Sequence, residues 1–380
     1  MEFIIKRELL TDAIGTVSKA VSTRTTIPIL TGIKIVAHED GVTLTGSDSD
    51  ISIEQFIPAQ SENEQSINII QTGVVVLPSR VFGDIVRKLP GEQVRISVNN
   101  RFMVTVSSER SEFNLNGMNA DEYPRLPQIE EDQIVSIPSD LLKTIIRQTV
   151  FAVATNETRP ILTGVMWKLD NGQLSFVATD SHRLTTRTAA VEVSNDLSFE
   201  NIIIPGKSLN ELSRILPEND QLVYIVITDN QILVKVNHIL FYSRILDGTY
   251  PDTSRIIPRH TKTEIILSTR EFLGAIERAS LLAKDGKNNV VRLFTRPDGV
   301  IEISSNTPEI GKVTEEIIPA SMEGEEVKIS FNAKYMLDAL RASDSSEIKV
   351  GFTGAMSPFI LRPTDHNWLL HLILPVRTNQ

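Results

Sequence analysis

Two short stretches of this 380-residue chain carry side chains that could ligate a metal ion. Asp48-Ser49-Asp50 offers two carboxylates, and Thr179-Asp180-Ser181-His182 offers a carboxylate and an imidazole. Joined in space, Asp48, Asp50, Asp180 and His182 would suit a metal-dependent hydrolase, because a bound divalent ion can activate water. A local structure is favoured instead, since Asp after Ser or Thr at a strand end commonly makes a side-chain turn.

Other signatures of catalysis are missing from the sequence. No phosphate-binding Gly-rich loop, H-E-x-x-H or G-x-S-x-G motif occurs, and the remaining histidines show no ligand spacing. The absence of cysteine excludes disulfides, thiolate zinc sites and cysteine nucleophiles. We therefore expect no metal and no cofactor.

Basic residues recur at a constant interval along the chain. Arg80, Lys207 and Lys334 form one series, and a second series seven residues later consists of Arg87, Arg214 and Arg341, so that successive copies keep the same spacing in both series. At 100° per residue, both bases of each copy lie on the helix face opposite the apolar residues. A net charge of −10 argues against a surface that is basic throughout, so the pattern indicates a local basic stripe for a polyanion such as a nucleic acid backbone.

An acidic residue accompanies each basic pair. Asp84, Glu211 and Asp338 keep the same interval and stand three or four residues from the bases. Such spacing permits ion pairs along a helix, so a merely solvated surface is the alternative interpretation for any single copy. Three copies in an acidic chain favour a shared anionic ligand.

Further repeats divide the chain into three units. Glu122-Tyr123-Pro124 recurs at the interval of the bases as Thr249-Tyr250-Pro251, and Ile29-Leu30-Thr31-Gly32 recurs at a slightly longer one as Ile161-Leu162-Thr163-Gly164. The units span 1–127, 128–254 and 255–380. Each is predicted to begin with a helix, continue with hairpins, and contain a second helix starting at Pro78, Pro205 or Asn332. The fold class is α+β, with helices on antiparallel sheets.

Composition is that of a folded protein, with 41% hydrophobic and 23% charged residues. No apolar run approaches the roughly 18 residues of a membrane span, and the N-terminus lacks the pattern of an export signal. We expect a cytoplasmic protein.

Four stretches resemble one known family: Thr26–Leu30, Ala178–Leu184, Tyr250–Asp252 and Leu374–Arg377. They are similar to bacterial DNA polymerase III beta subunits, the replicative sliding clamps, and Arg24–Ile35 and Glu112–Leu126 are closest to the Gram-positive type. The resemblance implies a DNA clamp fold in which two chains close a head-to-tail ring of six domains around duplex DNA, without catalysis.

A size argument agrees with two chains. Twelve helices at about 9 Å spacing form a circle about 34 Å across, which leaves a bore of about 24 Å after one helix diameter of about 10 Å is subtracted. Six helices would leave only about 7 Å, too narrow for a duplex whose radius is about 10 Å.

The resemblance and the basic stripe together imply three sets of site residues. The first set would face DNA: Arg24, Arg80, Arg87, Lys207, Arg214, Lys334 and Arg341. The second would form the dimer seam: Phe113, Leu281 and Leu282. The third would form a pocket for client peptides of Gln-x-x-Leu-Phe type: Leu162, Thr179, His182, Arg183, Leu184, Pro251, Arg255, Ile256, Asn332, Tyr335, Met356, Leu372, Leu374, Pro375, Val376 and Arg377.

Within the pocket, Leu184, Ile256, Leu372 and Leu374 are expected to anchor the peptide, with His182 and Arg183 at the rim. The implied partners are duplex DNA, a second copy of the chain, the polymerase III catalytic subunit, the clamp loader, mismatch-repair proteins, ligase and translesion polymerases. Besides the metal-dependent hydrolase, a repeat scaffold that binds only proteins remains an alternative.

Overall fold

The computed structural model describes residues 1–22, 25–61, 64–126, 134–156, 158–193, 197–283, 289–307 and 310–377. Its contacts divide the chain into two compact units. One consists of Met1–Asp140, Val193–Asn195 and Asn210–Ile245, and the other of Leu141–Glu192, Asp196–Leu209 and Leu246–Gln380. The middle repeat contributes to both units, because its strands join sheets that begin in each neighbouring repeat.

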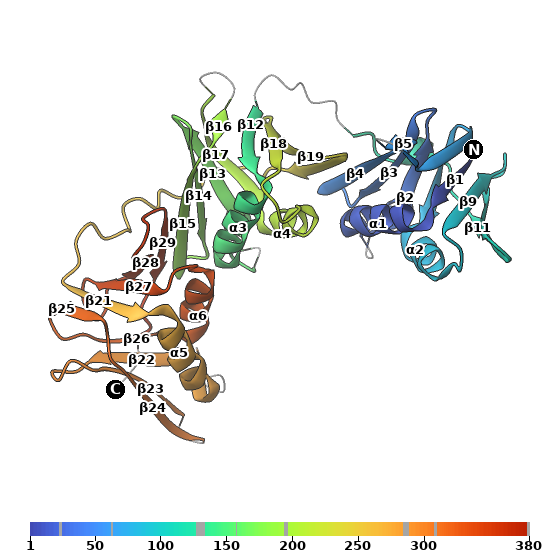
Figure 1. Cartoon of the computed structure of the whole chain (residues 1–380). Helices are drawn as coiled ribbons and strands as arrows, with labels where there is room; N and C mark the ends of the chain where they lie inside the picture. Colours follow the sequence, from blue (N-terminus) through green and yellow to red (C-terminus); the bar gives the residue numbers. More distant parts are fainter. Residues whose placement is uncertain are drawn as a thin grey trace. The chain divides into compact units, whose positions relative to one another are not determined.

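Each of three successive repeats contains a first helix, several strands, a second helix and three further strands, and this part of the order is as the sequence predicts (Figure 1). The first contains β1 (Glu2–Lys6), α1 (Arg7–Val17), β2 (Gly32–Ala37), β3 (Gly41–Ser47), β4 (Ile51–Pro58), β5 (Gln60–Ser61), β6 (Glu64–Gln65), β7 (Ile67–Gln71), β8 (Gly73–Pro78), α2 (Ser79–Lys88), β9 (Gln93–Val98), β10 (Met103–Ser108) and β11 (Ser111–Asn116).

The second repeat contains β12 (Ile134–Pro138), α3 (Ser139–Thr149), β13 (Gly164–Asp170), β14 (Gln173–Thr179), β15 (Arg183–Ala190), β16 (Glu192–Val193), β17 (Phe199–Pro205), α4 (Gly206–Ile215), β18 (Leu222–Ile227), β19 (Gln231–Val236) and β20 (Ile239–Arg244).

The third repeat contains β21 (Thr263–Ser268), α5 (Thr269–Ala283), β22 (Val290–Thr295), β23 (Ile301–Thr307), β24 (Gly311–Ile317), β25 (Ser321–Gly324), β26 (Lys328–Asn332), α6 (Ala333–Ala342), β27 (Glu347–Phe352), β28 (Phe359–Pro363) and β29 (Leu369–Ile373).

A strand precedes the first helix of every repeat, which the sequence analysis did not predict. In the first repeat Phe3 and Ile5 alternate with more exposed neighbours along β1 and are buried. This period of two is the pattern of a half-buried strand. The strand continues directly into the helix at Arg7, so no turn residue marks the boundary between the two elements in the sequence.

The first repeat contains hairpins, as predicted. Strands β2 and β3 pair antiparallel with Lys34 opposite Thr45, and β9 and β10 pair with Ile96 opposite Val106. Phe102 lies in the turn of the latter hairpin with φ of 58°. The turn needs a left-handed residue there, and the strand therefore begins at Met103.

The second helices begin one residue later than predicted. Pro78 is the N-cap of α2 and ends β8, with φ of −55° and ψ of 115°. Asn332 is the N-cap of α6, and its side chain accepts a hydrogen bond from the Lys334 N–H at 2.9 Å. Capping by a side-chain oxygen satisfies an N–H that has no partner within the helix.

Two long antiparallel sheets join neighbouring repeats. One has the strand order β16-β12-β18-β19-β20-β4-β3-β2-β8, and the other β17-β13-β14-β15-β29-β28-β27-β21-β25. The junctions are β20 with β4 and β15 with β29. The other sheets are a five-stranded sheet, β11-β10-β9-β1-β7, a four-stranded sheet, β24-β23-β22-β26, and the two-stranded sheet β5-β6.

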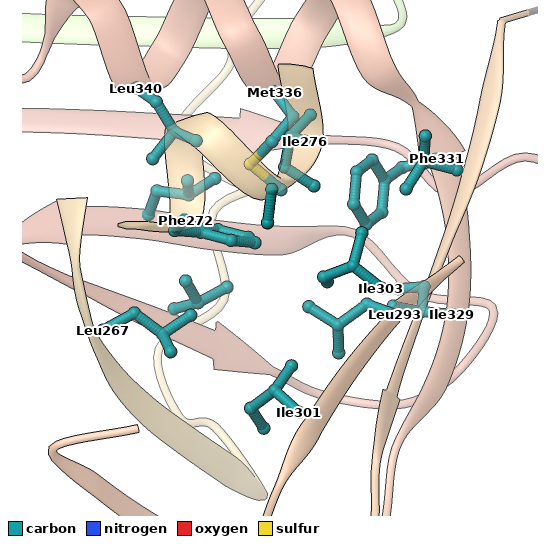
Figure 2. Packing of buried hydrophobic residues seen from close by; sticks show 14 of the residues in the cluster. Leu267, Phe272, Ile276, Leu293, Ile301, Ile303, Ile329, Phe331, Met336 and Leu340 are labelled. Carbon is teal, nitrogen blue, oxygen red and sulfur yellow. The ribbon is translucent and has the colours of Figure 1, made fainter. Parts of the chain in front are cut away.

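The core of the third repeat shows how helices and sheets pack. Figure 2 shows Phe272 and Ile276 of α5 and Met336 of α6 pointing into the same layer as Leu293 and Phe331 from the strands. All five are buried. Helices α5 and α6 lie side by side, as do α1 and α2 in the first repeat (Figure 1). Burial of one face of each helix leaves its opposite face in solvent.

No helix in the described part of the chain is long and apolar enough to cross a membrane.

Candidate functional sites

The second helices expose their basic residues, as predicted. Arg80 and Arg87 lie on the exposed face of α2, whereas Phe82 and Val86 are buried on the other face. On α4 and α6 the equivalent bases are also exposed: Lys207, Arg214, Lys334 and Arg341. Arg24, expected to face DNA, lies outside the described residues.

Acidic neighbours pair with these bases at the predicted spacing. Arg87 lies 3.3 Å from Asp84, Arg214 lies 2.8 Å from Glu211, and Lys334 lies 3.2 Å from Asp338. The bases in these pairs are more than 60% exposed, so each pair contributes at most about 1 kcal/mol. Ion pairs of that strength leave the bases available to phosphate.

Arg341 pairs differently from its equivalents. Its Nη2 lies 2.8 Å from Glu277 of α5, because Asp338 is engaged elsewhere. Arg341 and Lys334 line a cavity of about 380 Å³ between α5 and α6, together with Leu281 and Leu337. Leu281, expected in the dimer seam, is 63% exposed, and Phe113 of β11 is 42% exposed. Leu282 is half-buried.

The candidate metal ligands make local turns. Asp48 Oδ1 accepts hydrogen bonds from the N–H groups of Asp50 and Ile51, and Asp180 Oδ1 accepts equivalent bonds from His182 and Arg183. The same bonds at corresponding places in two repeats show that this carboxylate shapes the turn of a repeated hairpin. No cluster of three or more metal-ligating side chains occurs among the described residues. The hydrogen bonds confirm the local side-chain turns that the sequence predicts at Asp48 and Asp180.

Arg183 lies at the centre of the predicted peptide site and is buried, which corrects its expected place at the rim. Its Nε lies 3.0 Å from Asp180, its Nη1 lies 2.6 Å from Asp338, and its Nη2 donates to the Phe151 carbonyl. The guanidinium also lies over the rings of Phe151 and Tyr335. A cation with this many partners holds strand β15 against helix α6, while His182 beside it is exposed.

The predicted apolar anchors fall into two groups. Leu184 and Leu372 lie opposite each other across β15 and β29 and are each 1% exposed, within a buried cluster that also includes Leu162. A side chain this deeply buried cannot be a direct peptide anchor in this conformation. Leu374 is half-buried against the same cluster, and Ile256 is 47% exposed. These two residues remain as apolar contacts at the surface.

The other predicted pocket residues are buried to different depths. Tyr335 is half-buried on α6, with its ring centroid 6.4 Å from that of His182. Burial raises the pKa of the Tyr335 hydroxyl. Asn332, Pro375 and Val376 are half-buried, whereas the exposed residues are Pro251, Arg255, Met356 and Arg377.

Backbone hydrogen bonds hold the C-terminal residues of the site. The Leu374 N–H donates to the His182 carbonyl at 2.9 Å, and the Val376 N–H donates to the Ser330 carbonyl at 2.7 Å. The segment after β29 therefore continues strand-like contacts, and removing it would disturb the fold as well as the site.

Tyr250 of the second Tyr-Pro corner is buried in the apolar cluster of the predicted peptide site. Its hydroxyl accepts a hydrogen bond from the Thr179 N–H at 3.0 Å, and the Thr179 hydroxyl donates to the Arg183 carbonyl at 2.6 Å. Burial raises the pKa of Tyr250. In the first repeat, the Tyr123 hydroxyl donates to the carbonyls of Gly32 and Thr45, so both corners attach a buried tyrosine to strand backbone, through different hydrogen bonds.

Asp338 and Phe151 contact Arg183 and were not predicted to do so. Asp338 is 155 positions from Arg183, and its spacing in the sequence indicates pairs with Lys334 and Arg341 only. No local spacing indicates such a contact, because it depends on how β15 and α6 pack.

Comparison with known proteins identifies the class to which this fold belongs. Family models described as the DNA polymerase III beta subunit match in three parts: the N-terminal domain at residues 1–127, the central domain at 136–252 and the C-terminal domain at 254–377. Three such repeats with exposed basic helices define a DNA sliding clamp. The chain belongs to the DNA polymerase III beta subunit family.

Close relatives cover the whole chain. It is 57% identical over 378 residues to the beta sliding clamp of Bacillus subtilis and 55% identical over 379 residues to that of Halalkalibacterium halodurans, covering 100% of both chains in each case. A crystal structure of the B. subtilis DNA polymerase sliding clamp matches with a TM-score of 0.98 over 100% of both chains, at 57% identity.

A crystal structure of the beta chain of DNA polymerase III from Streptococcus pneumoniae matches with a TM-score of 0.95 at 37% identity, covering 99% of this chain and 100% of that one. The family consists of non-catalytic processivity factors that bind DNA and polymerase as dimeric rings. The predicted family, fold class and absence of catalysis are thus confirmed.

Proposed function

We propose that this chain forms a head-to-tail dimeric ring, encircles duplex DNA without reading its sequence, and tethers a replicative polymerase to its template. The repeats act as domains spanning 1–127, 128–254 and 255–380. The observation that carries the proposal is the exposure of six equivalent bases on the second helices, two in each repeat. Lys and Arg bind backbone phosphates without needing base contacts.

Ring closure is supported by two edge strands, each of which is paired, within the described part of the chain, with a neighbouring strand on one side only. Strand β4 pairs with β20 and β15 pairs with β29, whereas their equivalents β24 and β11 are edge strands. Both long sheets contain nine strands, and the sheets that end in β24 and β11 contain four and five. Pairing of β24 with β11 of a second copy would complete another nine-stranded sheet and remove two exposed edges. Phe113, Leu281 and Leu282 would lie at this seam.

Client proteins would dock through short linear motifs on the surface formed by Ile256, Leu374 and Tyr335. The clamp loader, the polymerase III catalytic subunit, mismatch-repair proteins, ligase and translesion polymerases are the proposed clients. Exposed or half-buried apolar side chains over a buried cluster offer the desolvated contacts on which such motifs depend. The protein would act in the cytoplasm, at the nucleoid.

DNA retention tests the proposal. The protein is loaded on nicked circular DNA, and the half-life of the bound protein is measured. The wild type is compared with the triple variant Arg80→Glu, Lys207→Glu and Lys334→Glu. The matched control reverses three strand bases whose side chains are 41–56% exposed, Arg95, Lys168 and Lys349. We expect short retention and a shallower salt dependence for the helix variant alone, by about one unit of slope per lost contact.

Linearising the circle separates encirclement from ordinary binding, because a ring slides off a free end. Wild-type protein that stays on linear DNA as long as on circles would contradict encirclement. If reversal of neither the helix bases nor the strand bases changes retention on DNA, and client proteins still bind, the result would favour a scaffold that binds only proteins.

A further inference from the structure

One carboxylate oxygen of α6 serves two cations. Asp338 Oδ2 lies 2.6 Å from Arg183 Nη1 and 3.2 Å from Lys334 Nζ. The cations differ in environment, since the Arg183 side chain is 6% exposed and that of Lys334 is 66% exposed. Lys334 can therefore exchange partners with solvent or a ligand, whereas Arg183 cannot move without unpacking its neighbours.

The two cations belong to different proposed sites. Lys334 is one of the bases on the exposed face of α6, and Arg183 lies beneath the peptide surface, over the ring of Tyr335 at 4.6 Å. Tyr335 in turn lies beside His182. Asp338 is thus the shared partner of a DNA-facing base and of a residue that positions the peptide site.

We propose that Asp338 couples DNA binding to client-peptide binding, an inference that rests on the proposed function. Two cations compete for the same oxygen. A phosphate that attracts Lys334 leaves this oxygen to Arg183, which strengthens the pair and fixes Tyr335 beneath the guanidinium. DNA binding therefore raises peptide affinity, and linkage requires that peptide raise DNA affinity by the same factor.

The expected size follows from the exposed pair. Lys334 and Asp338 stand at i,i+4 on the helix surface, where ion pairs are weak. A coupling of that strength changes affinity by about 1.5-fold to 5-fold. It would bias a loaded clamp toward clients without making their binding depend strictly on DNA.

The junction between the first and second repeats lacks the elements of this coupling. The residue that corresponds to Arg183 in the repeated hairpin is Ile51, a buried apolar side chain, so Glu211, which corresponds to Asp338, has no equivalent arginine to hold. Glu211 pairs with Arg214 on its own helix instead. The shared carboxylate is therefore a property of α6 and does not follow from the repeated pattern of bases and acids.

Peptide affinity of single variants tests the coupling. A fluorescein-labelled peptide containing Gln-Ala-Ser-Leu-Phe is titrated with full-length protein and followed by anisotropy. We expect Lys334→Ala to tighten binding about 1.5-fold to 5-fold, because it leaves Asp338 to Arg183, and Asp338→Asn to weaken it. Arg341→Ala is the matched control, since it removes a DNA-facing base of the same helix that pairs with Glu277.

The double variant distinguishes coupling from a structural effect. In the Asp338→Asn background, Lys334→Ala should no longer change peptide affinity. The inference is overturned if Lys334→Ala and Arg341→Ala have equal effects, or if the effect of Lys334→Ala persists without Asp338. Should Asp338→Asn fail to fold, the comparison of the two alanine variants decides alone. Wild-type protein that binds no peptide would instead overturn the proposed peptide site, and the coupling with it.

Discussion

Phe241 of β20 lies opposite Ile53 of β4, in the junction that joins the first repeat to the second. His371 of β29 lies opposite Thr185 of β15 in the next junction. Phe241 and His371 are each 1% exposed. The two junctions therefore have the same register, although one uses a phenylalanine and the other a histidine.

Phe113 occupies the equivalent place in β11. Each of the three residues is the last of a row that crosses three strands of its repeat, namely Ile96–Val106–Phe113, Ile225–Val234–Phe241 and Val350–Leu361–His371. On the other side of each junction, Ile53 of β4 and Thr185 of β15 occupy equivalent places in their repeats. The equivalent residue of the third repeat is Val313 of β24. The exposure of Phe113 thus indicates where a second chain would bind.

Engineered cysteines test this register directly, because the chain has none of its own. If Phe113 lies opposite the partner's Val313, then Asn114 lies opposite the partner's Lys312 in the antiparallel pair. We expect Asn114→Cys combined with Lys312→Cys to give a disulfide-linked dimer on a non-reducing gel. The control pairs Asn114→Cys with Thr314→Cys, two residues out of register, and equal crosslinking by the control would contradict the register.

Truncating the apolar side chains of the seam should weaken the dimer. We expect Leu281→Ala with Leu282→Ala to shift the solution mass toward monomer, since buried Leu to Ala changes typically cost about 2–5 kcal/mol. Mass photometry at nanomolar concentration measures the shift. A double variant that stays fully dimeric there would remove these residues from the seam.

Surface and buried residues of the peptide site should respond differently to substitution. Ile256→Ala is expected to weaken peptide binding by about tenfold at unchanged stability, because Ile256 is exposed. Leu184→Ala should lower unfolding free energy by about 2–5 kcal/mol, because Leu184 is buried. Anisotropy and thermal unfolding measure the two effects. Ile318→Ala, at an 80% exposed position outside the proposed site, is the control and should change neither.

Tyr250→Phe should destabilise the second repeat. The change leaves the buried Thr179 N–H without its acceptor, at an expected cost of about 1–3 kcal/mol. Denaturant unfolding followed by circular dichroism measures the loss. Tyr224→Phe is the matched control, because Tyr224 is 43% exposed. Equal effects of the two changes would show that the hydrogen bond contributes nothing.

His371 should make the folded protein sensitive to acid. Burial lowers the pKa of His371 to about 3, from an ordinary value near 6.5. Between these values the unfolded chain binds a proton that the folded chain does not, so stability falls as pH falls from about 6.5 toward 3. The slope is about 1 kcal/mol per pH unit.

His371→Phe isolates this contribution, because phenylalanine is the residue at the equivalent places 113 and 241. We expect the difference in unfolding free energy between pH 7 and pH 5 to shrink in the variant. The comparison uses each protein's own change with pH, so a constant packing effect cancels. An unchanged pH dependence would assign the acid sensitivity to other groups.

The three repeats and their helices were predictable from the sequence. The constant interval between the bases and the apolar spacing of Phe82, Ile85 and Leu89 can be read from the order of residues and the geometry of one helix. The side-chain turns at Asp48 and Asp180 are equally local, since each carboxylate bonds to N–H groups two and three residues ahead. Family resemblance supplied the class of protein, and the comparisons confirm it.

Only the tertiary structure decided which of the predicted residues are buried and which partners they have. Leu184 and Leu372 lie beneath the site because β15 pairs with β29, a contact between strands that are far apart in the sequence. Arg183 is joined to Asp338 across 155 positions by the packing of that sheet against α6. A local pattern determines which face of a helix or strand is apolar, but the residues that cover this face lie far away in the sequence. The sequence by itself therefore determined the elements, and packing determined their contacts.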